Sequence, residues 1–210
     1  MSFAARGSLH GDKADESEDT MGKLVVTEFV TLDGVMEDPG GGEKDRFDRG
    51  GWAFQFDRGE DGDKFKFDEL KAADAQLLGR VTYEGFAKAW PAMADNPFGE
   101  KMNTMPKYVV SSTLEDPTWN NTTVLGADWP AAVAGLKEQF EGDILVAGSA
   151  QLVQGLVAND LVDELHLMVF PVVLGAGKHL FAGTDDTKAL ELVETKQAGE
   201  TVILVYRRQG

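Results

Sequence analysis

Hydrophobic positions along this chain form short continuous runs in some segments and follow helical spacing in others. The clearest case is the segment 143–152. Ile144, Leu145 and Val146 form a continuous apolar run, which is typical of a strand covered on both faces. Gly148 then permits a tight turn, and Ser149 is a favourable N-cap for a helix with apolar residues at helical spacing. This pattern predicts a buried strand that leads directly into a helix.

Similar patterns recur after about residue 62, where strand-like and helix-like segments alternate before the chain ends in strands. That order predicts an α/β sheet, parallel in the main, with an antiparallel edge formed by the C-terminal strands. The predicted strands are 23–30, 75–79, 107–111, 122–125, 144–146, 164–173, 190–197 and 201–207; the predicted helices are 64–73, 81–90, one after Asp128 and one after Ser149.

Two segments depart from this order. Residues 1–22 are polar and acidic without a hydrophobic period, so we expect a disordered leader before a single domain over 23–210. Residues 31–62 are rich in Gly and Asp, which suggests a binding loop. Its aromatic residues Trp52, Phe54 and Phe56 form either a flat wall for a heteroaromatic substrate, or an alternating strand that buries one face in the core or a dimer contact.

Composition narrows the possible partners. The chain has 36 acidic and 20 basic residues and a formal charge of -16, so its surface repels nucleic acid and anionic membranes. It has no cysteine, which excludes disulfides and thiolate chemistry, and no spacing of His, Asp or Glu suggests a metal site. No apolar run approaches the roughly 20 residues that cross a bilayer. We therefore expect a soluble cytoplasmic protein whose ligand is a small molecule.

Small and polar residues follow several of the predicted strands. Ligands of open α/β sheets bind beyond the carboxyl ends of the strands, and a glycine turn before a helix N-terminus favours anions. We therefore expect one shared cleft for a phosphate-and-sugar ligand, while a compact strand-to-helix turn would equally explain Gly148 and Ser149. The strand ends concerned carry residues 33–34, 79–80, 111–113, 148–149 and 174–177.

The order of these motifs resembles a known family. The chain contains TLDG at 31–34, LGRVTYE at 78–84, VSST at 110–113, AGSA at 147–150 and FPVVLGAG at 170–177. Together they resemble the dihydrofolate-reductase-like proteins that share the C-terminal reductase domain of the bifunctional riboflavin deaminase–reductase, RibD. The resemblance spans residues 22–208 and implies a dihydrofolate-reductase-like three-layer fold, a bound NADPH and a homodimer.

The resemblance also assigns roles to individual residues of the motifs. It implies cofactor contacts at four strand ends: Gly79, Arg80 and Thr82 at the phosphates; Ser111, Ser112 and Thr113 at the adenosine ribose and its 2′-phosphate; Gly148, Ser149, Ala150 and Gln151 at the pyrophosphate; and Leu32, Asp33 and Gly34 at the nicotinamide.

Some of these residues have alternative roles. The guanidinium of Arg80 matches phosphate geometry, but an ion pair with Glu84 at i,i+4 is also available to it. Ser111 and its neighbours equally suit turn chemistry before Pro117.

Reduction of a substrate by hydride often requires a proton donor as well. The candidates are Asp33 and Asp57, followed by Glu84 and Tyr83. Asp33 lies in a turn, where a bond to backbone is the alternative role. Asp57 follows Trp52 at a spacing similar to that between the Trp and the pterin-binding carboxylate of dihydrofolate reductases.

The sequence thus favours an NADPH-dependent reductase of a small heteroaromatic or carbonyl substrate, pteridine- or pyrimidine-like. The resemblance suggests a reductase of the type that acts on 5-amino-6-(5-phosphoribosylamino)uracil in riboflavin biosynthesis. However, the four basic residues of segment 31–62 form no pattern that matches a phosphorylated substrate of that family. Two alternatives stay open: an NADPH-binding module or sensor without turnover, and another phosphate-ligand-binding α/β enzyme.

Overall fold

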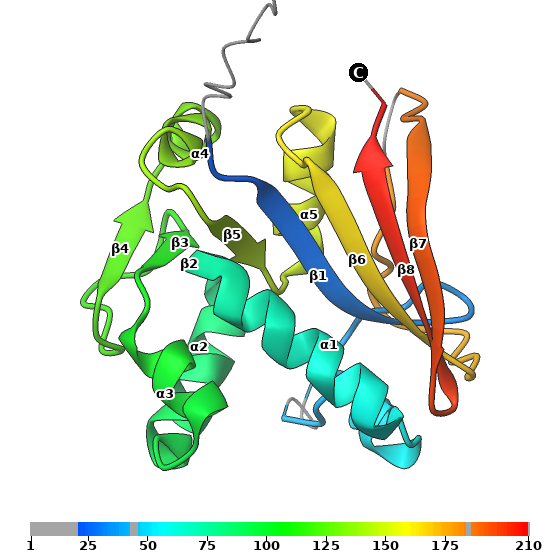
Figure 1. Cartoon of the computed structure of the whole chain (residues 1–210). Coiled ribbons are helices and arrows are strands. Elements are labelled where there is room, and N and C mark those ends of the chain that lie inside the picture. Colours follow the sequence, from blue (N-terminus) through cyan, green and yellow to red (C-terminus); the bar gives the residue numbers. More distant parts are fainter. Residues whose placement is uncertain (1–20, 43–45, 184–185, 210) are drawn as a thin grey trace, which may run out of the picture.

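The protein folds around a single eight-stranded sheet. The structure is a computed structural model that describes residues 21–42, 46–183 and 186–209. The strand order is β4-β3-β2-β5-β1-β6-β8-β7, and every pair from β4 to β6 is parallel (Figure 1). Strand β8 is antiparallel to both β6 and β7. The predicted α/β architecture with an antiparallel C-terminal edge is confirmed.

The elements follow one another as strand–helix pairs and end in strands. The strands are β1 (Leu24–Thr31), β2 (Ala73–Gly79), β3 (Lys107–Val110), β4 (Thr122–Leu125), β5 (Asp143–Val146), β6 (Glu164–Phe170), β7 (Leu190–Ala198) and β8 (Thr201–Arg208). The helices are α1 (Gly59–Ala72), α2 (Arg80–Ala89), α3 (Pro97–Thr104), α4 (Trp129–Lys137) and α5 (Ala150–Ala158), with 3₁₀ turns η1 (Trp52–Gln55) and η2 (Trp90–Met93).

Helices cover both faces of the sheet, which gives three layers. Helices α4 and α5 contribute Val133, Leu136, Val153 and Leu156 to one core cluster. The opposite face packs against α1, α2 and α3, and Figure 1 shows α1 lying across it. Alternate residues of β1 serve the two layers, with Val26 in the first cluster and Val25 in the second. The predicted three-layer fold is therefore confirmed.

The differences from the predicted elements are local. Helix α1 begins at Gly59 rather than residue 64, and β6 ends at Phe170 rather than residue 173. Helix α3 was not predicted, because its sequence PFGEKMNT combines Pro and Gly with little apolar periodicity. Asn96 nevertheless caps it, since the side chain accepts a hydrogen bond from the N–H of Gly99 at 2.9 Å.

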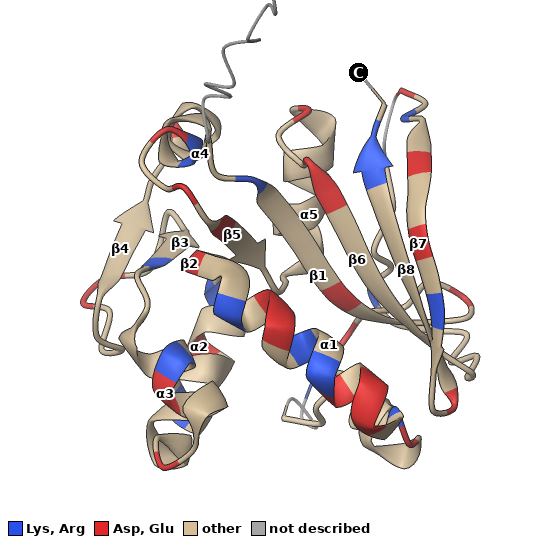
Figure 2. Ribbon diagram, viewed as in Figure 1, with Lys and Arg blue, Asp and Glu red and all other residues tan. Residues whose placement is uncertain are grey.

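The first described residues lie against the end of α4. The N–H of Gly22 donates to the carbonyl oxygens of Lys137 and Phe140, at 2.9 and 2.7 Å. Residues 1–20 of the proposed leader lie outside the described part of the chain. Acidic and basic residues are interspersed along α1 (Figure 2). Among the described residues, no helix is long and apolar enough to cross a membrane.

Candidate functional site

The carboxyl ends of β2 and β5 lead side by side into the helices α2 and α5. Leu77 pairs with Val146 in the parallel ladder, so the turns that follow are neighbours. The N–H of Gly79 donates to the carbonyl oxygen of Gly148 at 3.2 Å. A Cβ on Gly79 would collide with the side chain of Ser149, and one on Gly148 would lie 2.7 Å from Oγ1 of Thr82. Both positions require glycine, and the two turns form one packed unit.

Both helices begin without a side-chain cap. Gly79 is the N-cap of α2, and Ser149 occupies the N-cap position of α5 in extended conformation. The predicted position of Ser149 is confirmed, but its hydroxyl does not cap the helix. Within the described chain, the hydroxyls of Thr82 and Ser149 have no hydrogen-bond partner. Two helix N-termini and two free hydroxyls therefore stand together, a combination that attracts anions.

Arg80 lies at the first position of α2, beside this pair of turns. Its Nη1 is 2.7 Å from Oε1 of Glu84, so the ion pair that the spacing allowed is present. The side chains of Arg80 and Glu84 are 40% and 36% exposed. Exposed pairs of this kind contribute at most about 1 kcal/mol, so a phosphate ligand competes readily for the guanidinium.

Ser111 follows β3, the neighbour of β2. Its N–H donates to the carbonyl oxygen of Leu125 at 3.0 Å. Its hydroxyl accepts hydrogen bonds from the N–H groups of Thr113 and Leu114, at 3.1 and 2.9 Å. The predicted turn chemistry is therefore present at Ser111. Ser112 and Thr113 are exposed beside it.

Asp33 joins the loop after β1 to the loop after β6. Its carboxylate accepts hydrogen bonds from the hydroxyl of Thr31 at 2.6 Å and from the N–H groups of Gly175 and Leu174 at 2.7 and 3.2 Å. These donors, the Thr31 hydroxyl first among them, lower the pKa of Asp33 to about 2. Asp33 is thus ionised at neutral pH and acts as an acceptor that fixes two loops, which disfavours it as a proton donor.

Leu32 and Gly34 flank Asp33 in the loop after β1. Leu32 is 64% exposed, which is unusual for a leucine beside a core strand. Its N–H donates to the carbonyl oxygen of Val172 at 2.9 Å. Gly34 has a φ of 79°, a left-handed conformation that favours glycine. The loop therefore presents an apolar side chain to solvent from a tightly bonded backbone.

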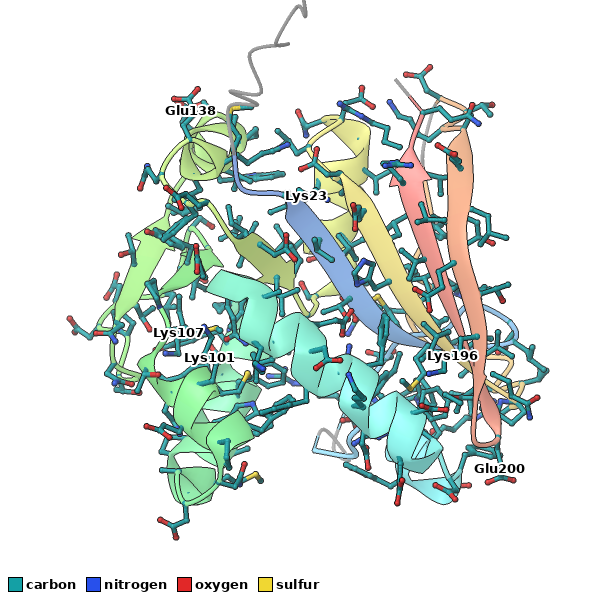
Figure 3. All side chains as sticks on the ribbon, in the orientation of Figure 1. Lys23, Lys101, Lys107, Glu138, Lys196 and Glu200 are labelled. Carbon is teal, nitrogen blue, oxygen red and sulfur yellow. The ribbon has the colours of Figure 1, made fainter. Side chains whose placement is uncertain are left out.

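Asp57 lies at the start of α1, against the β7–β8 hairpin. Its carboxylate accepts the N–H of Gly59 at 2.7 Å, and its N–H donates to the carboxylate of Glu200 at 2.8 Å. Figure 3 labels Glu200 at the tip of this hairpin. Asp57 is exposed, and its second carboxylate oxygen makes no hydrogen bond within the described residues.

The three aromatic residues of segment 31–62 do not form a common surface. Trp52 is buried, with its indole N–H donating to the carbonyl oxygen of Glu37 at 2.9 Å. Trp52 and Phe56 both contact Phe170 edge-on, at centroid distances of 5.3 and 6.3 Å. Phe54 points away and is 77% exposed. The flat wall is wrong, because Phe54 faces solvent while Trp52 and Phe56 pack on Phe170. The alternating strand is wrong because residues 52–55 form η1, but the burial in the core that came with it is present at Trp52 and Phe56.

Sequence reasoning missed two buried carboxyl groups, Glu28 and Glu69. Glu69 accepts hydrogen bonds from the hydroxyl of Thr27, at 2.9 and 3.0 Å, and lies 2.7 Å from Nζ of Lys66 and 2.6 Å from Nδ1 of His166. Burial raises the pKa of Glu69, but Lys66 and His166 outweigh burial and hold it below its usual value. The negative charge of Glu69 is thus offset by its partners, and the cluster joins α1 to the sheet.

Glu28 has a different environment on the other face of β1. Its residue is only 8% exposed, and its Oε1 accepts the N–H of Gly148 at 2.5 Å. Burial raises its pKa to about 8. The signal in the sequence was its place in the period-2 row of Leu24, Val26 and Val30, which all face the core. A carboxyl in that row points inward.

Comparison with known proteins places this arrangement in a family. The chain is 32% identical over 186 residues to YwjB, an uncharacterised protein of Bacillus subtilis (strain 168), with 89% of this chain and 98% of YwjB covered. A structure of a protein assigned to riboflavin biosynthesis from Shewanella sp. PV-4 superposes with a TM-score of 0.69, at 18% identity and 90% and 99% coverage. Dihydrofolate reductase from Enterococcus faecalis, complexed with NADP(H), gives a TM-score of 0.52, at 17% identity and 90% and 98% coverage.

These structural likenesses establish a dihydrofolate-reductase-like fold for the chain. The family assignment comes from the sequence itself. The family model of the RibD C-terminal domain matches residues 22–204, which is nearly the whole described chain. The protein therefore belongs to the RibD C-terminal domain family.

Proposed function

We propose that the protein is a reductase that binds NADPH and reduces a small heteroaromatic or carbonyl substrate. One observation carries the proposal: the uncapped N-termini of α2 and α5 lie side by side at the carboxyl end of the sheet. Membership in the RibD C-terminal domain family supports it, as does the fold shared with a dihydrofolate reductase that binds NADP(H).

The residues present fit a dinucleotide pyrophosphate. Each helix N-terminus carries a partial positive charge of about half an elementary charge and offers free N–H groups. The glycines at positions 79 and 148 keep the backbone free of side chains where it would approach the phosphates. The hydroxyls of Thr82 and Ser149 and the N–H groups at the start of α5, Ala150 and Gln151, complete the donor set. Arg80 supplies the local positive charge that a protein of net charge -16 needs for an anionic ligand.

The strand order supports proposed positions for the remaining contacts. The turn after β3, with Ser112 and Thr113 exposed, lies one strand beyond this cradle and is the proposed site of the ribose 2′-phosphate. The loop of Leu32 and Gly34 after β1 is the proposed nicotinamide side. When bound, NADPH supplies the hydride. In that arrangement Asp33 holds the loops after β1 and β6 in place, and Leu32 shields the reacting carbon from water.

Asp57 is the proposed substrate contact, because one of its carboxylate oxygens is free to accept a hydrogen bond. A pteridine or pyrimidine ring offers N–H donors that match such a carboxylate. The first substrate to test is 5-amino-6-(5-phosphoribosylamino)uracil, followed by pteridines that lack the phosphate. Turnover of the second group alone would separate this chain from the riboflavin pathway.

The proposal is tested by removing the charge at the cradle. Arg80→Ala should weaken NADPH binding by about tenfold to a hundredfold, since charge-assisted hydrogen bonds contribute about 1.5–3 kcal/mol. Lys88→Ala, in the last turn of the same helix, is the matched control and should leave the dissociation constant within about twofold. Equal affinities of both variants and the wild type would overturn the proposed cradle.

We also propose that the protein forms a homodimer through the sheet edge. Strand β7 is exposed along almost its whole length. Leu192 and Val193 are each 50% exposed, and Val202 of the neighbouring β8 is 39% exposed. Exposed apolar residues on an edge strand are suited to cover by a second copy, although β7 also carries Glu191, Glu194 and Lys196. Light scattering should give a dimer for the wild type and a monomer for Leu192→Lys; a wild-type monomer would refute this.

A further inference from the structure

Glu28 stands at a place in the fold where a carboxyl group is exceptional. Its row on β1, with Leu24, Val26 and Val30, faces the layer of α4 and α5. Glu28 pairs with Leu167 of β6 on one side. On the other side, β5 ends its pairing at Val146, opposite Val26, so the chain beyond it turns toward α5 at the level of Glu28. The carboxyl group of Glu28 therefore lies in the core, next to the point where β5 ends and the chain turns toward α5.

The carboxyl is bonded directly to the proposed phosphate cradle. Oε1 of Glu28 accepts the N–H of Gly148 at 2.5 Å. Gly148 in turn accepts the N–H of Gly79 through its carbonyl and packs against Thr82. One hydrogen bond thus links Glu28 to both turns that carry the helix N-termini.

No cation pairs with Glu28 in the described structure. Helix α5, with the sequence AQLVQGLVA, carries no ionisable side chain, and β5 carries none after Asp143. The charged groups that act on Glu28 from the other face are Lys66 and Glu69 of α1, which lower and raise its pKa respectively. Burial outweighs these and the Gly148 hydrogen bond, and raises the pKa of Glu28 to about 8.

We propose that Glu28 is a positioning residue that couples proton uptake to binding of the anionic cofactor. The inference rests on the proposed function of the cradle. In its neutral form, the carboxyl holds the Gly148 turn without adding charge behind the site. In its ionised form, it places a negative charge one hydrogen bond away from the bound phosphates. An anion in the cradle therefore favours the protonated form, and by reciprocity protonation favours the anion.

The consequence is a specific pH dependence of NADPH binding. Well below pH 8 the carboxyl of Glu28 is already neutral, so its titration does not change the affinity for NADPH there. Above that value, binding takes up a proton from solvent to neutralise the carboxyl. The dissociation constant for NADPH should rise at least about fivefold between about pH 7 and about pH 9.5, since one linked proton changes affinity by up to tenfold per pH unit.

The variant Glu28→Gln separates this role from a merely structural one. Its amide oxygen still accepts the N–H of Gly148, but the group no longer titrates. The variant should bind NADPH with a dissociation constant that changes by less than about twofold over the same pH range. Glu138→Gln, at the exposed C-cap of α4, removes the same charge away from both the cradle and β7 and should keep the wild-type profile. Lys107, whose pKa is also about 8, is present in all three proteins and cancels in the comparison.

Calorimetry of the wild type alone gives a second readout that does not depend on the variant folding. Binding heats at about pH 8.5, measured in buffers of different ionisation enthalpy, should reveal uptake of a substantial fraction of one proton per NADPH. Uptake in the wild type and none in Glu28→Gln support the inference. NADPH binding with no proton uptake, or with the same profile in both proteins, overturns it and leaves the proposed function standing. Absence of NADPH binding by the wild type at any pH overturns both.

Discussion

Gly79 and Ser149 pack so closely that a side chain on the first would occupy the position of the second. A Cβ on Gly79 would collide with the hydroxyl of Ser149 and lie 3.1 Å from its backbone N. Because these residues begin two different helices, their contact is what brings the two N-termini together. The proposed cofactor site therefore depends on the absence of one methyl group.

Gly79→Ala tests this contact. Overpacking should lower the free energy of unfolding by about 1–3 kcal/mol and separate the two turns, which weakens NADPH binding. Gly85→Ala is the matched control, because it lies in the same helix with no atom within 4 Å of its added Cβ. That control should gain up to about 1 kcal/mol from helix propensity. Denaturant unfolding and calorimetry measure both effects, and equal behaviour of the two variants would contradict the packing argument.

Asp33 is expected to stabilise the protein in a pH-dependent way. Its pKa falls from 3.8 to about 2 on folding, so its stabilisation is present above about pH 4 and is lost as pH falls through 2. Asp33→Asn should unfold at lower denaturant concentration at neutral pH, and its difference from the wild type should shrink in acid. Asp48→Asn, an exposed residue without a hydrogen bond in the described structure, should show no such pattern. A difference that stays constant with pH would refute the role of the carboxylate.

Lys107 is a buried lysine that pairs with no carboxylate among the described residues. Its ammonium donates to the carbonyl oxygens of Asn103, Met105 and Asn120 and lies 4.3 Å from the ring centroid of Trp119. Figure 3 labels it beside α3. Burial lowers its pKa from 10.5 to about 8. The folded protein therefore releases this proton at lower pH than the unfolded chain.

The sign of the effect follows from that release. Between about pH 8 and about pH 10.5 the unfolded state binds more protons at this site, so stability should rise with pH. Lys107→Met removes the titrating group. The urea midpoint of the wild type should therefore rise relative to that of the variant as the pH increases over this interval. Parallel curves for the two proteins would show that the lysine titrates normally.

Trp52 and Phe54 should respond oppositely to truncation, although they are neighbours in one turn. Trp52→Ala should cost about 3–5 kcal/mol, because it opens a cavity against Phe170. Phe54→Ala should change stability by less than about 0.5 kcal/mol, since the ring is 77% exposed. Thermal unfolding distinguishes the two. Comparable losses would mean that Phe54 packs against a partner in solution.

The sheet was predictable because some of its strands, β5 above all, are continuous apolar runs in the sequence. The run Ile144 to Val146 is buried on both faces, as is typical of a central parallel strand covered by helices. The glycines at positions 79 and 148 also indicated turns, since each closely follows apolar residues of a predicted strand. The sequence does not show that these two turns are neighbours. They are neighbours because β2 and β5 pair in parallel in the sheet.

The loops and the polar interior could not be predicted in the same way. Trp52, Phe54 and Phe56 alternate in sequence, but η1 forms in place of the alternating strand that was one of two alternatives, and Phe54 faces solvent. Glu28 shares the alternating row of Leu24, Val26 and Val30, which indicates an inward-facing carboxyl group. What the sequence does not show is that the helix layer of α4 and α5 covers this row and that the N–H of Gly148 meets the carboxyl group.

The central claim is that the paired turns of α2 and α5 bind a dinucleotide phosphate, and thermal unfolding with NADPH tests it most directly. At about 100 times its dissociation constant, NADPH should add about 2.7 kcal/mol to the free energy of unfolding. NADH, which lacks the 2′-phosphate, should produce a clearly smaller shift at the same concentration. No shift with either dinucleotide, together with a shift from ATP or a sugar phosphate, would contradict the account and favour a different phosphate-binding enzyme.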